Sequence, residues 1–463
     1  MERENIRELL ERIARLESQI EALRKENLAL KKENAELKRR LGLDSSNSSK
    51  PPSSDPPSMK YPRRTPTGGK PGKQRGAKGH RRHFGPPTTI VDHRPDICSH
   101  CGAAIGDDVP VTGDYQRRQQ VEIPPIEPIV IERRYHGVRC PHCRRVTRAK
   151  PLESEKMCYG SRLGALIAIL ATVHNLTRRH IGALLSTVLG TRLSLGTIDN
   201  CIHEVGDAVK DPVEALRGEL AQQAGLNIDE TGWKKGSERR WLWTFVAPTL
   251  TFFHIAESRG KRVLEYILGK RFDGIIVSDR YGAYRAYDKG GWQVCLAHLI
   301  REAKALSQSS DPGTSRFGFW ARRELKLMIK LCKKGKANSL QMNSCKARLN
   351  RACRLQRASP DKYARRFANA VLNDWKAVTL FTTVEGVSPT NNAAERSLRQ
   401  SVIARKISFG NHSQKGLRTT ERLRTIIATA GVRGIDGWDY LAHALTQHRA
   451  GQPVPLLQAS HSG

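Results

Sequence analysis

The sequence predicts a multidomain α+β protein, and three features of its 463 residues support this class. Apolar heptads fill residues 6–41, two Cys-x-x-Cys pairs follow a Ser- and Pro-rich segment, and strand-like segments alternate with helical ones after residue 223. A chain of this length exceeds what one hydrophobic core usually organises. We therefore expect several domains in series.

The chain is strongly basic, with 79 Lys and Arg against 45 Asp and Glu. Binding to a nucleic acid releases the counterions of its phosphates, so a protein this basic is expected to have double-stranded DNA as a partner. The longest apolar run, residues 163–173, is too short to cross a bilayer. Charged residues from Glu2 onward do not fit a secretory signal. We expect a cytoplasmic protein with no membrane partner.

Residues 1–43 are expected to form a parallel coiled coil that joins two copies of the chain. The heptad a positions hold Ile6, Ile13, Ile20, Asn27, Asn34 and Leu41, and every d position from residue 9 to residue 37 is leucine. Isoleucine at a with leucine at d favours two parallel strands, and buried asparagines fix their register. Opposite charges also face each other in three g-to-e pairs: Arg12–Glu17, Glu26–Lys31 and Glu33–Lys38. The alternative, a lone amphipathic helix on a domain surface, explains five unbroken heptads less well.

Residues 44–87 are rich in Ser, Pro and Gly and are expected to be a disordered basic linker, because such a segment buries too little apolar area to offset its ordering entropy. Residues 60–82 contain nine Lys or Arg and no acid, among them Lys73 and Arg75. This part is either a solubilising tether or a flexible arm that lies along the DNA backbone. Both interpretations stay open.

Residues 88–152 predict a zinc ribbon with one structural Zn²⁺. Two knuckles, "CSHC" and "CPHC", supply four thiolates for a closed tetrahedral site, from Cys98, Cys101, Cys140 and Cys143. The strand-like residues 121–138 suggest a hairpin between the knuckles. His100 and His142 lie inside the knuckles and are expected to be exposed rather than ligands. The alternative is a chance occurrence of both cysteine pairs.

Residues 153–222 predict a helical region that includes three helices, near residues 161–175, 176–190 and 194–209. Gly190 is a natural end for the second helix, and Ser194 or Thr197 can cap the third. Two helices joined by a short Gly-containing turn, with Arg178 and Arg179 nearby, fit a DNA-binding helix-turn-helix. Generic helical packing explains the pattern equally well, so both remain alternatives.

Residues 223–310 predict a mixed sheet flanked by helices. Three strand-like segments form an expected antiparallel meander, at residues 225–233, 240–247 and 250–257. A helix, a buried strand at 274–279, a second helix, a strand at 292–298 and a further helix follow. Residues 311–386 predict a basic helical insertion, since residues 316–366 hold sixteen Lys or Arg and two acids. The last core helices are expected at 387–430, and a C-terminal helix and tail at 431–463.

Three acids are candidates for a metal site at the carboxyl end of the sheet. Asp229 lies in the first strand, Asp279 ends the buried strand, and Glu395 begins a helix whose apolar stripe should face the sheet. Three such carboxylates can hold two Mg²⁺ ions for phosphodiester chemistry. For each aspartate the alternative is an ordinary turn or cap residue. For Glu395 it is a capping box with Asn392 as the N-cap, and one residue can do both.

The motifs as a set resemble transposases of the insertion sequence 66 family over nearly the whole chain. They are the heptads, the "NSSKPPSSD" linker, the two knuckles, "DET", "SDRYGAY", "CLAHLIRE" and "NNAAERSLR". The resemblance implies a ribonuclease H-like DDE nuclease with a helical insertion before the glutamate. It assigns the catalytic, Mg²⁺-binding triad to Asp229, Asp279 and Glu395. Glu230 adjoins Asp229 on the same strand, so only one of the two can face the site.

The resemblance further implies a bacterial, nucleoid-associated transposase that binds terminal inverted repeats and catalyses strand cleavage and transfer. Cys295 and His298 match a Cys-x-x-His motif of related enzymes, where they either position DNA or simply pack beside the sheet. Arg396 and Arg399 are expected to face phosphates. Companion proteins from the same element are a further expected partner. The alternative function is a catalytically inactive, zinc-containing dimeric regulator derived from a transposase.

Overall fold

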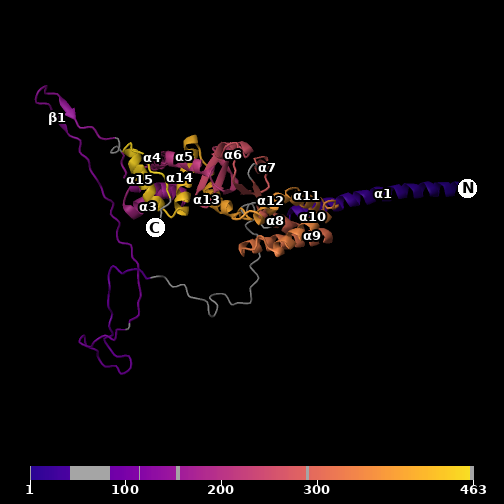
Figure 1. Ribbon diagram of the computed structural model, residues 1–463, viewed down its shortest axis with the longest axis horizontal. Helices are drawn as coiled ribbons and strands as arrows, with labels where there is room; N and C mark the ends of the chain where they lie inside the picture. The colour runs from indigo at the N-terminus through magenta and orange to yellow at the C-terminus, as the bar shows by residue number, and fades with distance from the viewer. Residues whose placement is uncertain (1, 42–83, 114, 153–156, 288–290, 459–463) are drawn as a thin grey trace.

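The computed structural model describes residues 2–41, 84–113, 115–152, 157–287 and 291–458 (Figure 1). Lys73, Arg75 and most of the expected linker lie outside these residues. The chain begins with one long helix, α1 (Glu2–Leu41). Its described apolar a and d side chains, Ile13, Leu16, Ile20, Leu23 and Leu30, are 48 to 62% exposed in the single chain. The helix agrees with the helix predicted for residues 1–43, and its pairing with a second copy of the chain stays a prediction.

The hairpin expected between the two knuckles is not formed. The strands of this region are β1 (Gly137–Arg139) and β2 (Val146–Arg148), which pair antiparallel around the second knuckle. Residues 121–136 contain no strand. Pro124, Pro125 and Pro128 explain the difference, because each removes a backbone N–H that a ladder needs.

Four helices follow: α2 (Ser161–Thr172), α3 (Arg178–Leu189), α4 (Leu195–Ala208) and α5 (Lys210–Leu220). The predicted end of α3 and the predicted capping of α4 are confirmed. Gly190 ends α3 in the left-handed conformation, at φ 62°, and the Ser194 hydroxyl accepts a hydrogen bond from the Thr197 N–H at the start of α4. Helix α3 fully buries Ile181 and Leu185, and its other residues are partly buried or exposed.

A five-stranded mixed sheet forms the centre, in the order β5-β4-β3-β6-β7. The predicted meander is confirmed as β3 (Gly225–Lys235), β4 (Glu238–Val246) and β5 (Thr251–Ala256), all antiparallel. After α6 (Lys261–Leu268), β6 (Ile275–Ser278) pairs parallel with β3. Helix α7 (Gly282–Tyr287) leads to β7 (Trp292–Val294), parallel to β6. The last strand was expected to reach residue 298 but ends at Val294, because the chain turns helical from Leu296.

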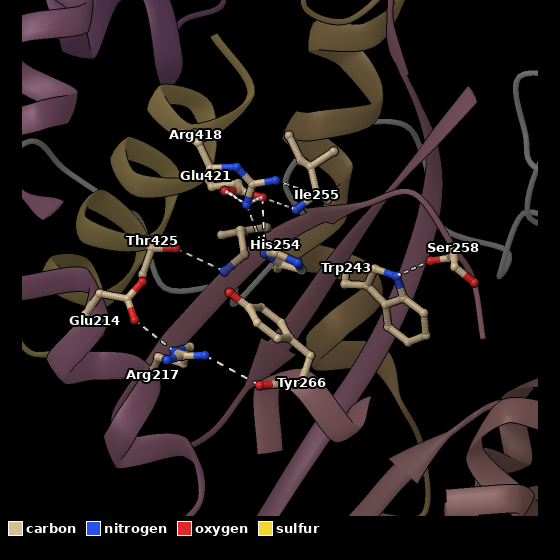
Figure 2. A network of polar contacts seen from close by, with 11 residues as sticks. Glu214, Arg217, Trp243, His254, Ile255, Ser258, Tyr266, Arg418, Glu421 and Thr425 are labelled. Carbon is tan, nitrogen blue, oxygen red and sulfur yellow. Dashed lines mark hydrogen bonds and ion pairs between the residues drawn. The ribbon is translucent and has the colours of Figure 1, made fainter. Parts of the chain in front are cut away.

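Side chains of helix α14 (Gln414–Val432) occupy the outer edge of β5. Thr429 accepts a hydrogen bond from the Thr251 N–H at 3.1 Å, and Thr425 accepts one from Phe253 at 3.0 Å. Glu421 accepts the Ile255 N–H and is held by Arg418, as Figure 2 shows. The three acceptors lie four residues apart on the helix, and the three N–H groups lie two residues apart on the strand. The spacings match because four helix residues rise about 6 Å and two strand residues span a similar length.

The opposite edge, β7, is covered by the end of the helical insertion. Helix α8 (Leu296–Ser307) precedes the insertion, which contains α9 (Pro312–Lys333), α10 (Leu340–Leu355), α11 (Lys362–Asn373), α12 (Trp375–Thr379) and a short 3-10 turn, Leu380–Thr382. The Gln293 side chain on β7 accepts a hydrogen bond from the Phe381 N–H at 2.8 Å and donates to the Val378 carbonyl at 3.4 Å. The predicted helical nature of the basic segment is confirmed.

Helices α13 (Asn392–Ser408), α14 and α15 (Gly437–Arg449) complete the fold. Helices α13 and α14 close one face of the sheet over Trp233, Phe253 and Leu398. Helix α14 also packs on α4, and α15 packs on α2, so the C-terminal helices join the helical region to the sheet (Figure 1). Among the described residues no helix is both long and apolar enough to span a bilayer.

Candidate active site

The site forms where β6 stops pairing with β3. Pairing between the two strands ends at Asn227, so the backbone groups of β3 after Asn227 have no partner from β6. Asn391 fills this gap: its amide donates to the Ile228 carbonyl at 2.7 Å, and its oxygen accepts from Asn227 at 3.0 Å. Asn391 is only 1% exposed, which makes these bonds necessary.

This geometry corrects the capping interpretation of Glu395. Helix α13 begins at Asn392, and the N-cap position is Asn391, whose side chain makes no capping bond because it is committed to β3. The Glu395 carboxylate bonds instead to Arg301 of α8, with both oxygens, at 3.1 and 3.2 Å. The His298 Nε2 atom lies 3.8 Å from the same carboxylate.

Strand alternation decides which acid of β3 faces α13. Asn227 contacts Asn391, and Thr231 accepts a hydrogen bond from Arg405 of α13 at 3.2 Å, so their shared face points toward α13. Asp229 lies between them in the alternation and belongs to the same face. Glu230 points the other way, where Tyr284 and Arg259 bind its buried carboxylate.

The two aspartates are oriented by backbone N–H groups. The Asp229 carboxylate accepts from the Glu230 N–H at 3.0 Å, and the Asp279 carboxylate accepts from the Tyr281 N–H at 2.9 Å. Burial raises the pKa of Asp229 well above its usual range, and the charges of Glu230, Asp279 and Glu395 raise that pKa further. Asp279 and Glu395 therefore repel the charge of Asp229, but the ligand atoms of the three acids do not all lie within 4.8 Å of one another among the described residues. A nearby cation would relieve that repulsion, and carboxylate oxygens are ligands that Mg²⁺ prefers.

Cys295 and His298 lie beside Glu395. One ligand atom of each of these three residues lies within 4.8 Å of the other two. Burial raises the pKa of the Cys295 thiol, and burial together with Arg301 lowers the pKa of His298. His298 is therefore a neutral imidazole at neutral pH, and its buried Nδ1 has no hydrogen-bond partner among the described residues.

The two cysteine knuckles repeat one backbone geometry. In the first, the Gly102 N–H donates to the Cys98 carbonyl at 2.9 Å; in the second, Arg144 donates to Cys140 at the same distance. Gly102 and Arg144 both have positive φ, 74° and 57°. In the first knuckle, the backbone N–H groups of His100 and Cys101 lower the pKa of the Cys98 thiol. In the second, the backbone N–H groups of Cys143 and His142 lower the pKa of the Cys140 thiol. A lowered pKa favours the thiolate that binds zinc.

The structure does not bring the four thiols together. Within the residues it describes, no cluster of three His, Cys, Asp or Glu ligand atoms includes Cys98, Cys101, Cys140 or Cys143. Each pair fits a zinc knuckle by itself, and His100 and His142 are exposed, as expected. The apolar residues between the pairs are also uncovered, with Ile129 91% and Val130 89% exposed.

The predicted DNA-binding arginines of the described residues lie at the surface. Arg396 and Arg399 are exposed on α13, and Arg179 is exposed on α3. Arg178 is half-buried because it pairs with Asp199 of α4 at 2.9 Å.

Three residues of the site were not predicted from the sequence. Asn227 and Asn391 fasten α13 to β3, and Arg301 supplies the counter-charge of Glu395. A signal for Arg301 was present, because Cys295, His298 and Arg301 recur every three residues along one face of α8. The Asn pair gave none, since an Asn at a helix start is usually a cap.

Comparison with known families now gives the affiliation. The model described as "Transposase IS66 family" matches residues 156–419, more than half of the chain. The chain belongs to this family. The IS66 zinc-finger domain, described as "zinc-finger binding domain of transposase IS66", matches residues 95–144 and supports structural zinc. A family of unknown function, DUF6444, matches residues 2–83.

One relative of this IS66 chain is the uncharacterized protein y4qI of Sinorhizobium fredii. The two are 25% identical over 249 residues, which is 48% of this chain and 46% of y4qI. The matched part thus spans less than half the length of that relative.

Proposed function

We propose that this protein is a transposase that binds the terminal inverted repeats of an insertion sequence and cuts and joins DNA strands with Asp229, Asp279 and Glu395. The observation that carries the proposal is the geometry where β6 stops pairing with β3. There Asp229 lies on the face of β3 toward α13, Asp279 directly follows β6, and Glu395 lies in the first turn of α13 beside exposed Arg396 and Arg399. The strand order β5-β4-β3-β6-β7, with three antiparallel strands and two parallel additions, supports a ribonuclease H-like fold.

In this proposal the acids bind the metal and the arginines bind the DNA. Two Mg²⁺ ions bound by the three acids would activate the attacking water or 3′-hydroxyl and stabilise the leaving oxygen. The backbone N–H groups of Glu230 and Tyr281 orient the aspartates, and Arg301 fixes Glu395 on α13. Arg396 and Arg399 contact phosphates on the outer side of the same helix. Cys295 and His298 position the DNA end beside Glu395.

Cleavage of inverted-repeat DNA tests the proposal directly. Purified protein, a duplex carrying the end of the element and Mg²⁺ should give a nick at the 3′ end of the element strand. Binding without any nicking, across all divalent cations tried, would instead favour the inactive DNA-binding regulator. Adding the companion proteins of the element tests whether they are needed.

Zinc content tests the ribbon. We expect one zinc per chain in the wild type and none after Cys140→Ser, because three thiolates hold a structural site poorly. Cys158→Ser is the matched control, since Cys158 is an exposed cysteine outside the knuckles. Equal zinc in the wild type and the Cys140→Ser protein would contradict the assignment.

Sedimentation tests the proposed dimer. Leu16→Ala together with Leu23→Ala should convert the dimer to monomer, because both d-position side chains leave the helix interface. Ser18→Ala with Lys25→Ala, at outward f positions of the same heptads, should leave the dimer intact. A dimer that survives the leucine changes would place its main interface outside α1.

A further inference from the structure

A cavity of about 390 Å³ lies between the helical region and the ends of helices α13 and α14. Its wall comes from the α2–α3 turn, α4, the last turn of α13 and the first turns of α14. The volume is in the range of ordinary ligand pockets. It is separate from the three acids, none of which lines it.

Arg424 is the unusual residue of this cavity. It lines the wall, is only 8% exposed, and forms no ion pair within the part of the chain that the structure describes. Among the described residues its hydrogen-bond partner is the Asn175 side-chain oxygen, 3.3 Å from a terminal guanidinium nitrogen, while its Nε is buried without a partner there. Burial alone lowers the pKa of Arg424 to about 10, and no neighbouring acid counters this shift.

Two other arginines, whose side chains are 7% and 8% exposed, are neutralised by glutamates. Arg433 pairs with Glu219 at 2.5 Å, and Arg449 pairs with Glu204 at 2.7 Å. Such pairing is the rule, because an isolated buried charge is costly. The acid of the cavity, Asp199, is already bound to Arg178 and lies 3.5 Å from His203. Arg424 therefore retains its charge for a ligand.

We propose that this cavity binds a phosphate group through Arg424, and that the phosphate belongs to the backbone of bound DNA. A planar guanidinium binds phosphate oxygens in pairs, which suits a deep site with one dominant ligand. The assignment to DNA rests on the proposed function; the preference for an oxyanion does not.

The position of the cavity favours DNA over a free anion as its source. Ser408, in the last turn of α13, lines the cavity, and Glu395 lies in the first turn of the same helix. Thirteen residues of helix separate them by about 20 Å. This is roughly half a turn of B-DNA, so the bound phosphate would lie several base pairs from the cleaved one. Arg178 stands at the rim, half-exposed.

Thermal unfolding of the full chain with inorganic phosphate tests the site. We expect phosphate to raise the unfolding midpoint of the wild type by a few degrees and to leave that of Arg424→Met unchanged. Without phosphate, Arg424→Met should unfold no earlier than the wild type, because an unpaired buried charge is replaced by an apolar chain. Arg422→Met is the matched control: Arg422 lies on the same helix, pairs with Asp207 at 2.8 Å and does not line the cavity. An equal phosphate effect in wild type and Arg424→Met would overturn the site.

Asn175→Gly serves if Arg424→Met fails to fold. Asn175 has a positive φ of 55°, which glycine adopts without strain, so the change removes only the side chain that faces Arg424. The phosphate effect should be at least as large in this variant, because the guanidinium loses the acceptor that competes with phosphate, and a lost effect would speak against the cavity.

Salt dependence of binding to a duplex of arbitrary sequence tests the DNA source. Loss of one phosphate contact should reduce the slope of log K against log salt by about 0.9 in Arg424→Met. An unchanged slope, with phosphate stabilisation lost, would overturn the DNA assignment and leave a site for free phosphate. Neither result depends on catalysis, so a failure of the cleavage proposal is recognised separately.

Discussion

The Glu395→Gln protein should lose about 1,000-fold or more of its Mg²⁺-dependent cleavage, because a neutral amide attracts the metal too weakly and a metal site contributes several kcal/mol to the transition state. The substitution keeps the size of the side chain. Nicking of inverted-repeat DNA at saturating Mg²⁺ measures the loss. DNA affinity, measured in parallel, should stay close to wild type because other residues contribute most of it.

The same change should barely affect folding. The Glu395–Arg301 pair is partly exposed, with 27% and 31% of the two side chains accessible, so it contributes at most about 1 kcal/mol. Helix α13 also keeps its attachment to β3 through Asn391. Glu385→Gln, an exposed residue ahead of α13, is the matched control and should cleave normally. Normal cleavage by the Glu395→Gln protein would exclude Glu395 from the triad.

Asp229→Asn should abolish cleavage to a similar extent and, unlike Glu395→Gln, stabilise the metal-free protein at neutral pH. Burial first, and then Glu230 and Asp279, raise the pKa of Asp229 in the folded state. In the unfolded chain an aspartate ionises near about pH 3.9. The folded state therefore keeps the Asp229 proton to a higher pH than the unfolded chain does. The free energy of unfolding falls as pH rises from the unfolded-state pKa of this residue through its folded-state pKa.

Asparagine removes this penalty because it does not ionise, and its oxygen can still accept the Glu230 N–H. The gain in the unfolding midpoint should be near zero below about pH 4, where Asp229 is protonated in both states, and largest above its raised pKa. Saturating Mg²⁺ should stabilise the wild type and not the variant. A lower midpoint for Asp229→Asn at neutral pH without metal would contradict this account.

Local patterns predicted much of the fold. Periodicity located α2 to α4 and the meander β3–β5, and residue type indicated Gly190 as the end of α3 and Ser194 or Thr197 as the cap of α4. Motif context, through the resemblance, proposed Asp229, Asp279 and Glu395 and preferred Asp229 to Glu230. These features depend on neighbours in sequence, which a single chain reveals.

The remaining features depend on contacts between distant segments. Asn391 and Asn392 are identical in type, and only the open carbonyl of Ile228 on β3 selects the first of them. Arg301 became the partner of Glu395 because α8 and α13 meet, at a separation of 94 residues. The hairpin forms around the second knuckle instead of in the apolar run before it. Three prolines in that run prevent the strand pairing that its apolar residues indicated.

The closed margins of the central sheet determine how copies of this protein can associate. A bare outer strand is a template on which a second chain adds its own strand. Here the N–H groups of Thr251, Phe253 and Ile255 are already bonded to α14, and Gln293 ties the other margin to the segment around Phe381. Growth of the sheet from one molecule to the next is therefore blocked on both sides. Copies of the protein that associate would contact each other through other surfaces than the two edges of this sheet.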